Sequence, residues 1–311
     1  MGVNQTFGLD DGREYEGVQN KPEVGAPLKP VEIDVDDGLV REYVNAVGDG
    51  GFWAFQAGVL ARHEISVAPM TLFDRDIGAK LVGFNARFAV HAKQSFRFLS
   101  PLKVGTTYCL SGEISDVATR REVGYFAAST VCSPVGDPDG VCVKSVYTRA
   151  YRFPNNQYAI RRDRQPLKLS QWLYDNRARM DAKFPSVGSA VDSRTAIMDS
   201  AHVNLYSGPN SGIHTDERIA RRAGFESTVV QGLMATELEC ELYRDLFGLR
   251  FFYGGSVEAS YIATIPCNVA LTATAVVVRA DDEDIEMRTA VAMGNGEVIS
   301  VSSVHARDWR G

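Results

Sequence analysis

The sequence predicts an α+β protein built from two copies of one unit, each with helix-like sequence followed by an antiparallel meander. The first observation is an internal repeat: segments 95–101 and 260–266 match in pattern, and their final prolines stand 165 residues apart. The second is that β-rich sequence follows each segment. Two similar halves are therefore expected, with their sheets joined around central helices.

Each copy continues into runs rich in Val, Thr, Ala and aromatic residues, which are typical of strands. The runs are 108–114, 124–132 and 141–153 in the first copy, and 269–279, 285–293 and 298–306 in the second. Turn-like sequences at 136–140 and 294–296 separate the last two runs of each copy. Consecutive antiparallel strands are therefore expected in both halves.

Helix-like sequence precedes each set of strands. The ranges are 37–47 and 70–81 in the first half, and 215–223 and 233–247 in the second. In the last range, apolar side chains recur mostly at i, i+3 and i+4, which predicts a long helix lying on a curved sheet. We expect an N-terminal extension (1–25), an N-terminal unit (26–153), a linker (154–187) with helical character over 171–184, and a C-terminal unit (188–311).

Composition narrows the classes of function. The chain has 311 residues, of which 45% are hydrophobic and 23% charged, and a net charge of −6. It shows no apolar run long enough for a membrane span and no basic footprint for nucleic acid, so a cytoplasmic, soluble protein is expected. Five unpaired cysteines favour reduced core residues over a disulfide framework or a zinc site.

The most informative stretch is 206–216, Tyr-Ser-Gly-Pro-Asn-Ser-Gly-Ile-His-Thr-Asp, followed by Gln-Gly-Leu-Met at 231–234. It resembles the signature of the MaoC-like R-specific enoyl-CoA hydratases, Ser-Gly-Asp-x-Asn-Pro-x-His-x-Asp and then a glycine that opens a central helix. The resemblance implies a double-hotdog fold. His214 and Gly232 match the family's histidine and glycine, but Pro209 stands at the position of the catalytic aspartate.

The resemblance implies that the chain adds water to, or removes it from, a coenzyme A or acyl-carrier thioester. The expected catalytic group is His214 as acid and base, Gly232 as oxyanion donor, and Asn210 and Ser211 as polar partners. The expected substrate-binding residues are Tyr206, Phe52, Trp53 and Gln231. No metal site and no bound cofactor are expected, and the family resemblance favours a homodimer.

The missing aspartate leaves alternatives open. A replacement carboxylate could come from Asp199 or from Asp49, which holds the family's aspartate position in the first half; Asp216 is expected to cap the helix that follows it. A second alternative is a hotdog thioesterase with Glu237 or Glu239 as its carboxylate. A third is a non-catalytic acyl-thioester-binding protein that has lost the acid and base pair.

Overall fold

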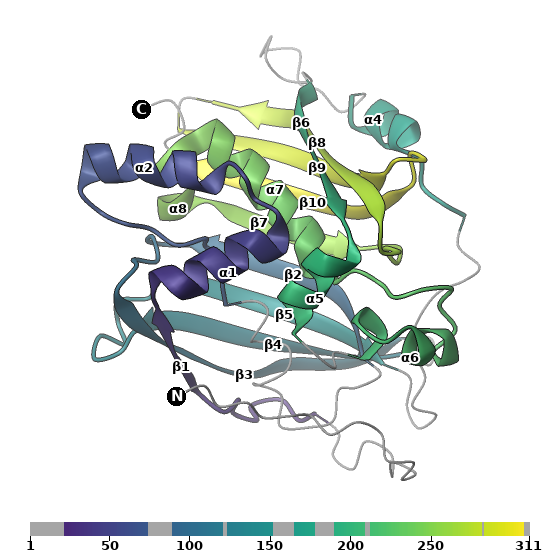
Figure 1. The fold of residues 1–311 in the computed structure, drawn as a ribbon, viewed down its shortest axis with the longest axis horizontal. Helices are drawn as coiled ribbons and strands as arrows, with labels where there is room; N and C mark the ends of the chain where they lie inside the picture. The colour runs from purple at the N-terminus through teal and green to yellow at the C-terminus, as the bar shows by residue number, and fades with distance from the viewer. Residues whose placement is uncertain are drawn as a thin grey trace.

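The computed structural model describes residues 22–73, 89–120, 123–151, 165–177, 190–208, 212–281 and 283–307. Its central feature is a ten-stranded antiparallel sheet with the order β1-β3-β4-β5-β2-β7-β10-β9-β8-β6 (Figure 1). The strands are β1 (Val31–Val35), β2 (Val90–Phe98), β3 (Thr106–Arg120), β4 (Val123–Pro134), β5 (Val143–Tyr151), β6 (Ala190–Met198), β7 (Ser256–Tyr261), β8 (Val269–Ala280), β9 (Asp284–Met293) and β10 (Val298–Arg307).

The two halves of the sheet join where β2 pairs with β7. At this seam Phe96 faces Val257, and Lys93 faces Ser260. On either side the strand order is the same when read outward, since β2-β5-β4-β3-β1 is matched by β7-β10-β9-β8-β6. The predicted repeat and the predicted α+β architecture are therefore confirmed.

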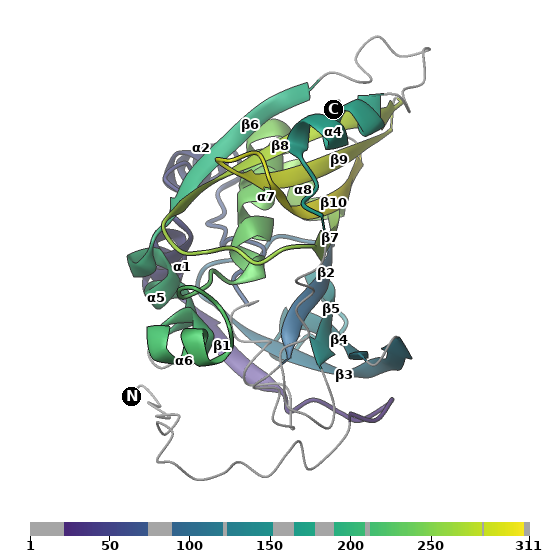
Figure 2. The same cartoon turned by 90° about the vertical axis from the view of Figure 1, so that its right-hand side faces the viewer.

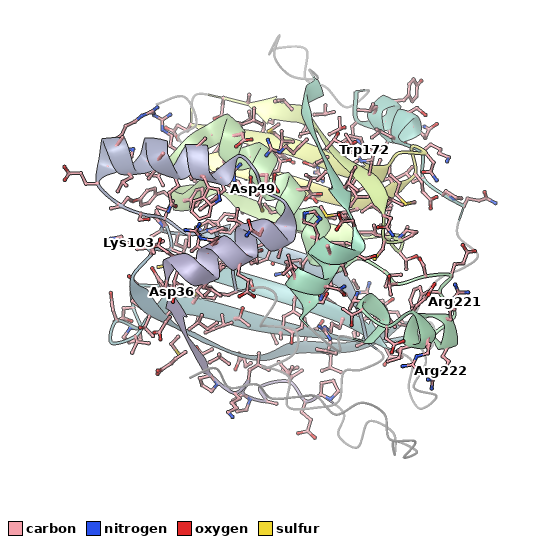
Figure 3. The ribbon with its side chains drawn as sticks, viewed as in Figure 1. Asp36, Asp49, Lys103, Trp172, Arg221 and Arg222 are labelled. Atoms are coloured by element: carbon pink, nitrogen blue, oxygen red, sulfur yellow. The ribbon has the colours of Figure 1, made fainter. Side chains whose placement is uncertain are left out.

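The helices gather on the concave side of this sheet, except for α4. They are α1 (Asp37–Val47), α2 (Phe52–His63), α4 (Leu169–Arg177), α5 (Ser200–Ser207), α6 (Glu217–Arg222), α7 (Gly232–Phe247) and α8 (Phe251–Gly254), with short 3-10 turns η1 (Gly212–His214) and η2 (Gly248–Arg250). Figure 2 shows the sheet curving around α7. Trp172 of α4 packs instead with Val276, Ala290 and Ala292 on the outer face (Figure 3).

The central helix α7 is buried on almost every side. One face, with Leu238 and Leu242, joins the main core between the two halves of the sheet. The helix also buries three carboxyl groups, Glu237, Glu239 and Glu241. Burial of charge is costly without a partner, so these groups must be paired or neutral.

In each half, an aspartate just after the first strand caps the helix that follows. Asp36 follows β1 and accepts a hydrogen bond from the backbone N–H of Leu39, which caps α1. Asp199 follows β6 and accepts one from the N–H of His202, which caps α5. An aspartate at this position satisfies a backbone donor that the helix itself leaves unpaired. The two helices pack against each other, and Tyr43 and Tyr206 meet with ring centroids 5.9 Å apart.

The structure confirms the helix predicted over 37–47, and α6 and α7 lie within a residue or two of the predicted 215–223 and 233–247. Helix α4 covers the first part of the predicted 171–184. The predicted helix over 70–81 lies outside the described residues beyond residue 73, as does most of the linker. Helices α2, α5 and α8 and strands β1, β2, β6 and β7 were not predicted. No helix in the described part of the chain is long and apolar enough to cross a membrane.

Glu239 makes the stability of this core depend on pH. Its side chain has no exposed surface and accepts a 2.6 Å hydrogen bond from Ser302, while burial raises the pKa of Glu239 to about 8. Between the unfolded value near 4.5 and about 8, the folded state holds a proton that the unfolded chain releases. The contribution of Glu239 to the free energy of unfolding is therefore largest at low pH and is lost as the pH rises through 8.

Glu239→Gln is accordingly expected to raise the melting temperature relative to wild type at pH 8.5, with a smaller difference at pH 5. Thermal unfolding followed by circular dichroism at the two pH values measures this. Glu258→Gln, at an exposed position on β7, serves as the control and should show no such trend. A Glu239→Gln difference that is equal at both pH values would contradict the account.

Candidate active site

His214 is fixed to the segment that leads into α7. It ends the short turn η1, and two hydrogen bonds join this turn to Val229. The N–H of Val229 donates to the carbonyl oxygen of Ile213 at 3.1 Å, and the His214 ring nitrogen Nδ1 lies 2.7 Å from the carbonyl oxygen of Val229. Since α7 begins at Gly232, the imidazole is held three residues before the helix.

This contact defines the chemistry of the imidazole. A carbonyl oxygen only accepts, so Nδ1 carries the proton and Nε2 presents a lone pair. Burial, and to a smaller degree the positive charge of Arg149, lowers the pKa of His214 to about 4. The ring is therefore neutral at physiological pH and can accept a proton at Nε2.

The start of α7 offers backbone donors beside this base. Gln231 stands at the capping position, but its side chain gives no hydrogen bond to the helix; it donates instead to the Ser207 hydroxyl at 2.9 Å. The first amides of α7 thus donate no hydrogen bond to the side chain at the capping position, and the helix dipole adds positive potential there. Such an end is suited to hold a developing negative charge on oxygen.

Gly232 has a packing role as well. A side-chain carbon at this position would lie 3.0 Å from the ring of Tyr261. The Tyr261 hydroxyl shares a 2.7 Å hydrogen bond with Thr236, one turn further along α7. Glycine is needed here because the Tyr261 ring lies against the helix start.

Three further residues lie with Tyr261 across the β2–β7 seam. We call the four residues the seam cluster: His91, Tyr147, Arg149 and Tyr261. The His91 ring lies 4.8 Å from the Tyr261 ring and 6.3 Å from the Tyr147 ring. Arg149 faces His91 across the β2–β5 pair, and its guanidinium carbon lies 5.8 Å from the Tyr147 ring centroid.

His91, Tyr147 and Arg149 were not predicted as site residues. Their signal is present in β5, where Val143, Ser145 and Tyr147 are buried at every second position and Arg149 follows in the same series. A charged residue in line with an inward apolar face marks a functional site.

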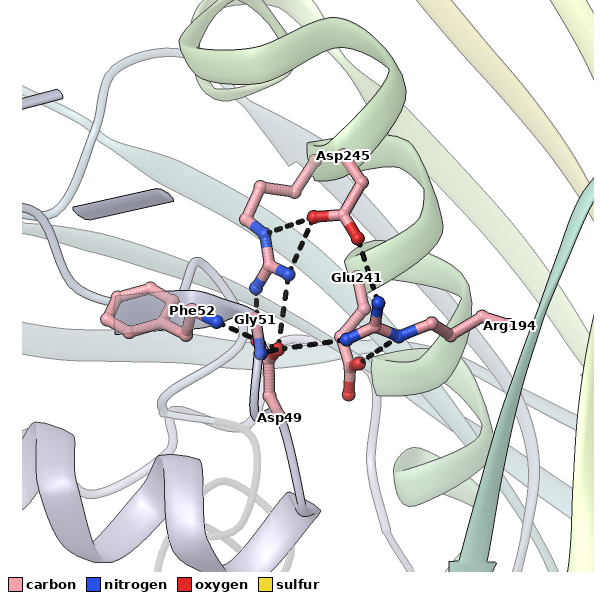
Figure 4. A network of polar contacts seen from close by, with 7 residues as sticks. Asp49, Gly51, Phe52, Arg194, Glu241 and Asp245 are labelled. Carbon is pink, nitrogen blue, oxygen red and sulfur yellow. Dashed lines mark hydrogen bonds and ion pairs between the residues drawn. The ribbon is translucent and has the colours of Figure 1, made fainter. Parts of the chain in front are cut away.

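Asp49 does not reach this region. Its carboxylate accepts hydrogen bonds from the N–H groups of Gly51 and Phe52, each at 3.1 Å, and is paired with Arg244 of α7 (Figure 4). Arg194 completes the network and lies 3.5 Å from Asp49. The side chains of Asp49 and Arg244 are each only 5% exposed. Through these hydrogen bonds and this ion pair, the Asp49 carboxylate links the start of α2 to the C-terminal part of α7.

Asp199, the other candidate carboxylate, interacts with His202 and not with His214. Besides capping α5 it lies 2.8 Å from Nδ1 of His202, and the pKa of Asp199 is lowered chiefly by the backbone N–H of His202. Within the described residues, the His214 ring is hydrogen-bonded to Val229, and no carboxylate is among the groups that shift the pKa of His214. Asp216 caps α6, as predicted.

The remaining predicted residues fall in different places. Tyr206 is buried between α5 and α1, and Gln231 joins the end of α5 to the start of α7. Phe52 is buried and Trp53 is 37% exposed. The Phe52 ring lies 5.9 Å from the guanidinium carbon of Arg244, twelve residues and roughly 18 Å along the helix from Gly232. Pro209, Asn210 and Ser211 lie outside the described residues.

The glutamates considered for a thioesterase also point elsewhere. Burial is the largest effect on Glu237 and raises its pKa to about 7, and the groups that oppose this are Thr71 and Tyr43, followed by Arg244. Glu239 faces Ser300 and Ser302 of β10. In the described ranges no three His, Cys, Asp or Glu side chains are grouped so as to hold a metal. All five cysteines are free thiols, and three of them are buried.

A family model matches the N-terminal half of the chain, whereas solved structures are similar over nearly all of it. Residues 23–146 match the model of the FAS1-like dehydratase domain region. The match covers the N-terminal half and does not include His214 or Gly232. A search of the curated proteins gave no match.

Solved structures are similar over nearly the whole chain. A MaoC-like dehydratase has a TM-score of 0.68 and 13% identity, over 91% of this chain and 98% of its own. A MaoC domain protein dehydratase from Chloroflexus aurantiacus has a TM-score of 0.65 and 13% identity, over 92% and 95%. A Mycobacterium tuberculosis protein described as a double hotdog has a TM-score of 0.57 and 14% identity, over 90% and 96%.

At such low identity the structural likeness establishes the fold, and the family match adds the dehydratase region of the N-terminal half. The order of strands and the central helix are those of a double hotdog. The double-hotdog fold implied by the 206–234 segment is thus confirmed, and the match to the dehydratase-region model concerns residues 23–146.

Proposed function

We propose that this protein hydrates 2-enoyl thioesters, or dehydrates the corresponding 3-hydroxyacyl thioesters, with His214 as its acid and base. The observation that carries the proposal is the pairing of a neutral imidazole, fixed through Nδ1, with the uncapped start of α7. A base and an oxyanion site side by side are what addition of water to a conjugated thioester requires. The likeness to MaoC-like dehydratases supports the same reaction class.

In the hydration direction, Nε2 of His214 takes a proton from water as the water oxygen bonds to C3 of the enoyl group. Electron density moves onto the thioester oxygen, which accepts a hydrogen bond from the first amides of α7. The imidazolium then returns its proton to C2, so that H and OH are added and the base is regenerated. In this scheme one residue serves in both steps.

The test is absorbance at the enoyl-thioester band while the protein is mixed with crotonyl-CoA and with longer and branched 2-enoyl-CoA thioesters. Loss of the band with formation of the 3-hydroxyacyl thioester supports the proposal. Release of free thiol would assign the scaffold to thioesterase chemistry instead. Saturable binding without either change would assign it to a non-catalytic thioester-binding protein.

The pH profile gives a second test of the role of His214. Since its pKa is lowered to about 4 in the free protein, the base stays unprotonated far below the ordinary histidine range. The acid limb of kcat/KM, which reports the free enzyme, is therefore expected to have its midpoint near 4 and not near 6.5. An acid limb near 6.5, with the protein still folded by circular dichroism, would contradict this environment for the base.

A homodimer, and an acyl-carrier thioester as the alternative to a coenzyme A thioester as substrate, are part of the proposal on family resemblance alone. Size-exclusion chromatography with light scattering measures the first. Parallel assays with enoyl-CoA and enoyl-acyl-carrier thioesters measure the second.

A further inference from the structure

Two buried polar atoms on the inner face of β5 have no hydrogen-bond partner among the described residues: Nε of Arg149 and the hydroxyl oxygen of Tyr147. The two residues are separated by one position and so share a face of the strand. Unsatisfied buried polar atoms are rare in folded proteins and call for a specific reason, such as a ligand that completes them. Here both belong to the seam cluster, beside the proposed active site.

Arg149 also lacks a counter-charge in the described part of the chain. Burial lowers the pKa of Arg149, and no carboxylate of the described residues is among the groups that oppose this effect. The other half-buried or buried arginines of the interior, Arg194 and Arg244, are paired with Asp49 and with further carboxylates. A desolvated guanidinium without an anion is unfavourable, so the position of Arg149 favours an anion that arrives with a ligand.

The guanidinium acts on the proposed base. After burial, its positive charge is a further cause of the lowered pKa of both His214 and His91. Arg149 and His214 therefore share one electrostatic environment, although they come from different halves of the chain. If the thioester oxygen of a substrate binds the first amides of α7, that oxygen does not pair with Arg149. A second negative group on the same substrate would then be the anion that pairs with Arg149.

We propose that Arg149, together with the Tyr147 hydroxyl, binds a carboxylate on the acyl group, and that the protein takes monothioesters of dicarboxylic acids. A carboxylate fits because its two oxygens match the planar donors of a guanidinium, and a phenol hydroxyl can donate to the same group. The inference rests on the proposed thioester function and names its substrate class.

Such a substrate would also activate the base. A carboxylate on Arg149 neutralises the charge that lowers the pKa of His214. The imidazole then becomes a stronger base in the complex than in the free protein, closer to the pKa at which general bases are most effective. Substrates without the carboxylate would bind beside an uncompensated cation and react more slowly.

The experiment measures binding of saturated thioesters, which cannot be hydrated, by titration calorimetry. Succinyl-CoA and glutaryl-CoA are compared with the chain-length matches butyryl-CoA and pentanoyl-CoA. The wild-type protein is expected to bind the carboxylated series at least about tenfold more tightly, as one charge-assisted hydrogen-bonded pair provides. Arg149→Gln is expected to remove the difference between the series, and Tyr147→Phe to reduce it.

Lys144→Gln is the matched control, because it removes one positive charge from the same strand at an exposed position. It should keep the preference. The melting temperature of Arg149→Gln should equal or exceed that of wild type, since a desolvated unpaired charge is removed; a fall would assign Arg149 a structural role instead.

Equal binding of the two series by the wild type, or a preference that survives in Arg149→Gln, overturns the carboxylate site. A loss of crotonyl-CoA hydration in Arg149→Gln, with the binding difference unchanged, assigns the guanidinium to the thioester oxygen and also overturns it. Binding of neither series overturns the thioester function itself and is thereby distinguished from failure of the carboxylate site alone.

Discussion

Replacing His214 by asparagine is expected to lower kcat for enoyl-thioester hydration by about 10²–10⁴-fold, the range that a positioned acid and base supplies. Asparagine can keep a donor near the position of Nδ1 and so preserve the contact with the Val229 carbonyl, but it has no basic nitrogen. KM should change little, because the interaction lost is made in the transition state.

His202→Asn is the matched control for that loss. His202 is the other histidine of the α5 region and pairs with Asp199, so it resembles a catalytic histidine–carboxylate pair more closely than His214 does. Its partner Asp199 caps the start of α5, and one third of the His202 side chain is exposed (33%). The His202 variant should retain activity. A His214 variant with near wild-type kcat, or a His202 variant with the larger loss, would contradict the assignment.

Asp49→Ala is expected to lower the free energy of unfolding by about 3 kcal/mol, the cost of removing one partner from a buried ion pair. The change leaves Arg244 without its buried carboxylate and removes the acceptor for the Gly51 and Phe52 amides at the start of α2. Urea unfolding followed by circular dichroism measures the effect.

Asp245→Ala gives the comparison within the same network. The side chain of Asp245 is 40% exposed and pairs with both Arg244 and Arg194, so water can replace much of what is lost. Its effect should stay below about 1 kcal/mol. A small effect for Asp49→Ala, together with a loss of catalysis, would show that this carboxylate acts in the reaction and would contradict its structural role.

The two halves differ in the residue that follows the glycine at the end of the first helix of each half. Gly48 closes α1 with φ 75° and Gly208 closes α5 with φ 71°, and the next residue is Asp49 in the first half but Pro209 in the second. The carboxylate of the first half forms an ion pair with Arg244.

The fold could be predicted where the signal is local. The repeat, the strand runs and the apolar spacing of 233–247 are properties of neighbouring residues, and they indicated the halves and the central helix. Strand β1 alternates exposed and half-buried residues over only five positions, and α2 carries Phe, Trp and Phe near its start with little periodicity. Short or weakly patterned segments acquire their conformation from packing against the rest of the chain.

The candidate site was predictable in part for the same reason. His214 and Gly232 belong to one motif, whereas Asp49 meets Arg244 across 195 residues and Arg149 meets His91 through strand register. Such contacts depend on the assembled sheet. An arginine within the inward series of β5 was visible in the sequence, but only the pairing of β2 with β5 and β7 brings it to the start of α7.

The most direct test of the proposed hydration is its product in heavy water. Wild-type protein and the His214→Asn variant are mixed with crotonyl-CoA in deuterium oxide, and the thioesters are analysed by mass spectrometry after return to ordinary water. The account predicts a 3-hydroxyacyl thioester with one deuterium at C2 from the wild type and unchanged substrate from the variant. Free acid with coenzyme A, or equal product from both proteins, would contradict hydration by His214.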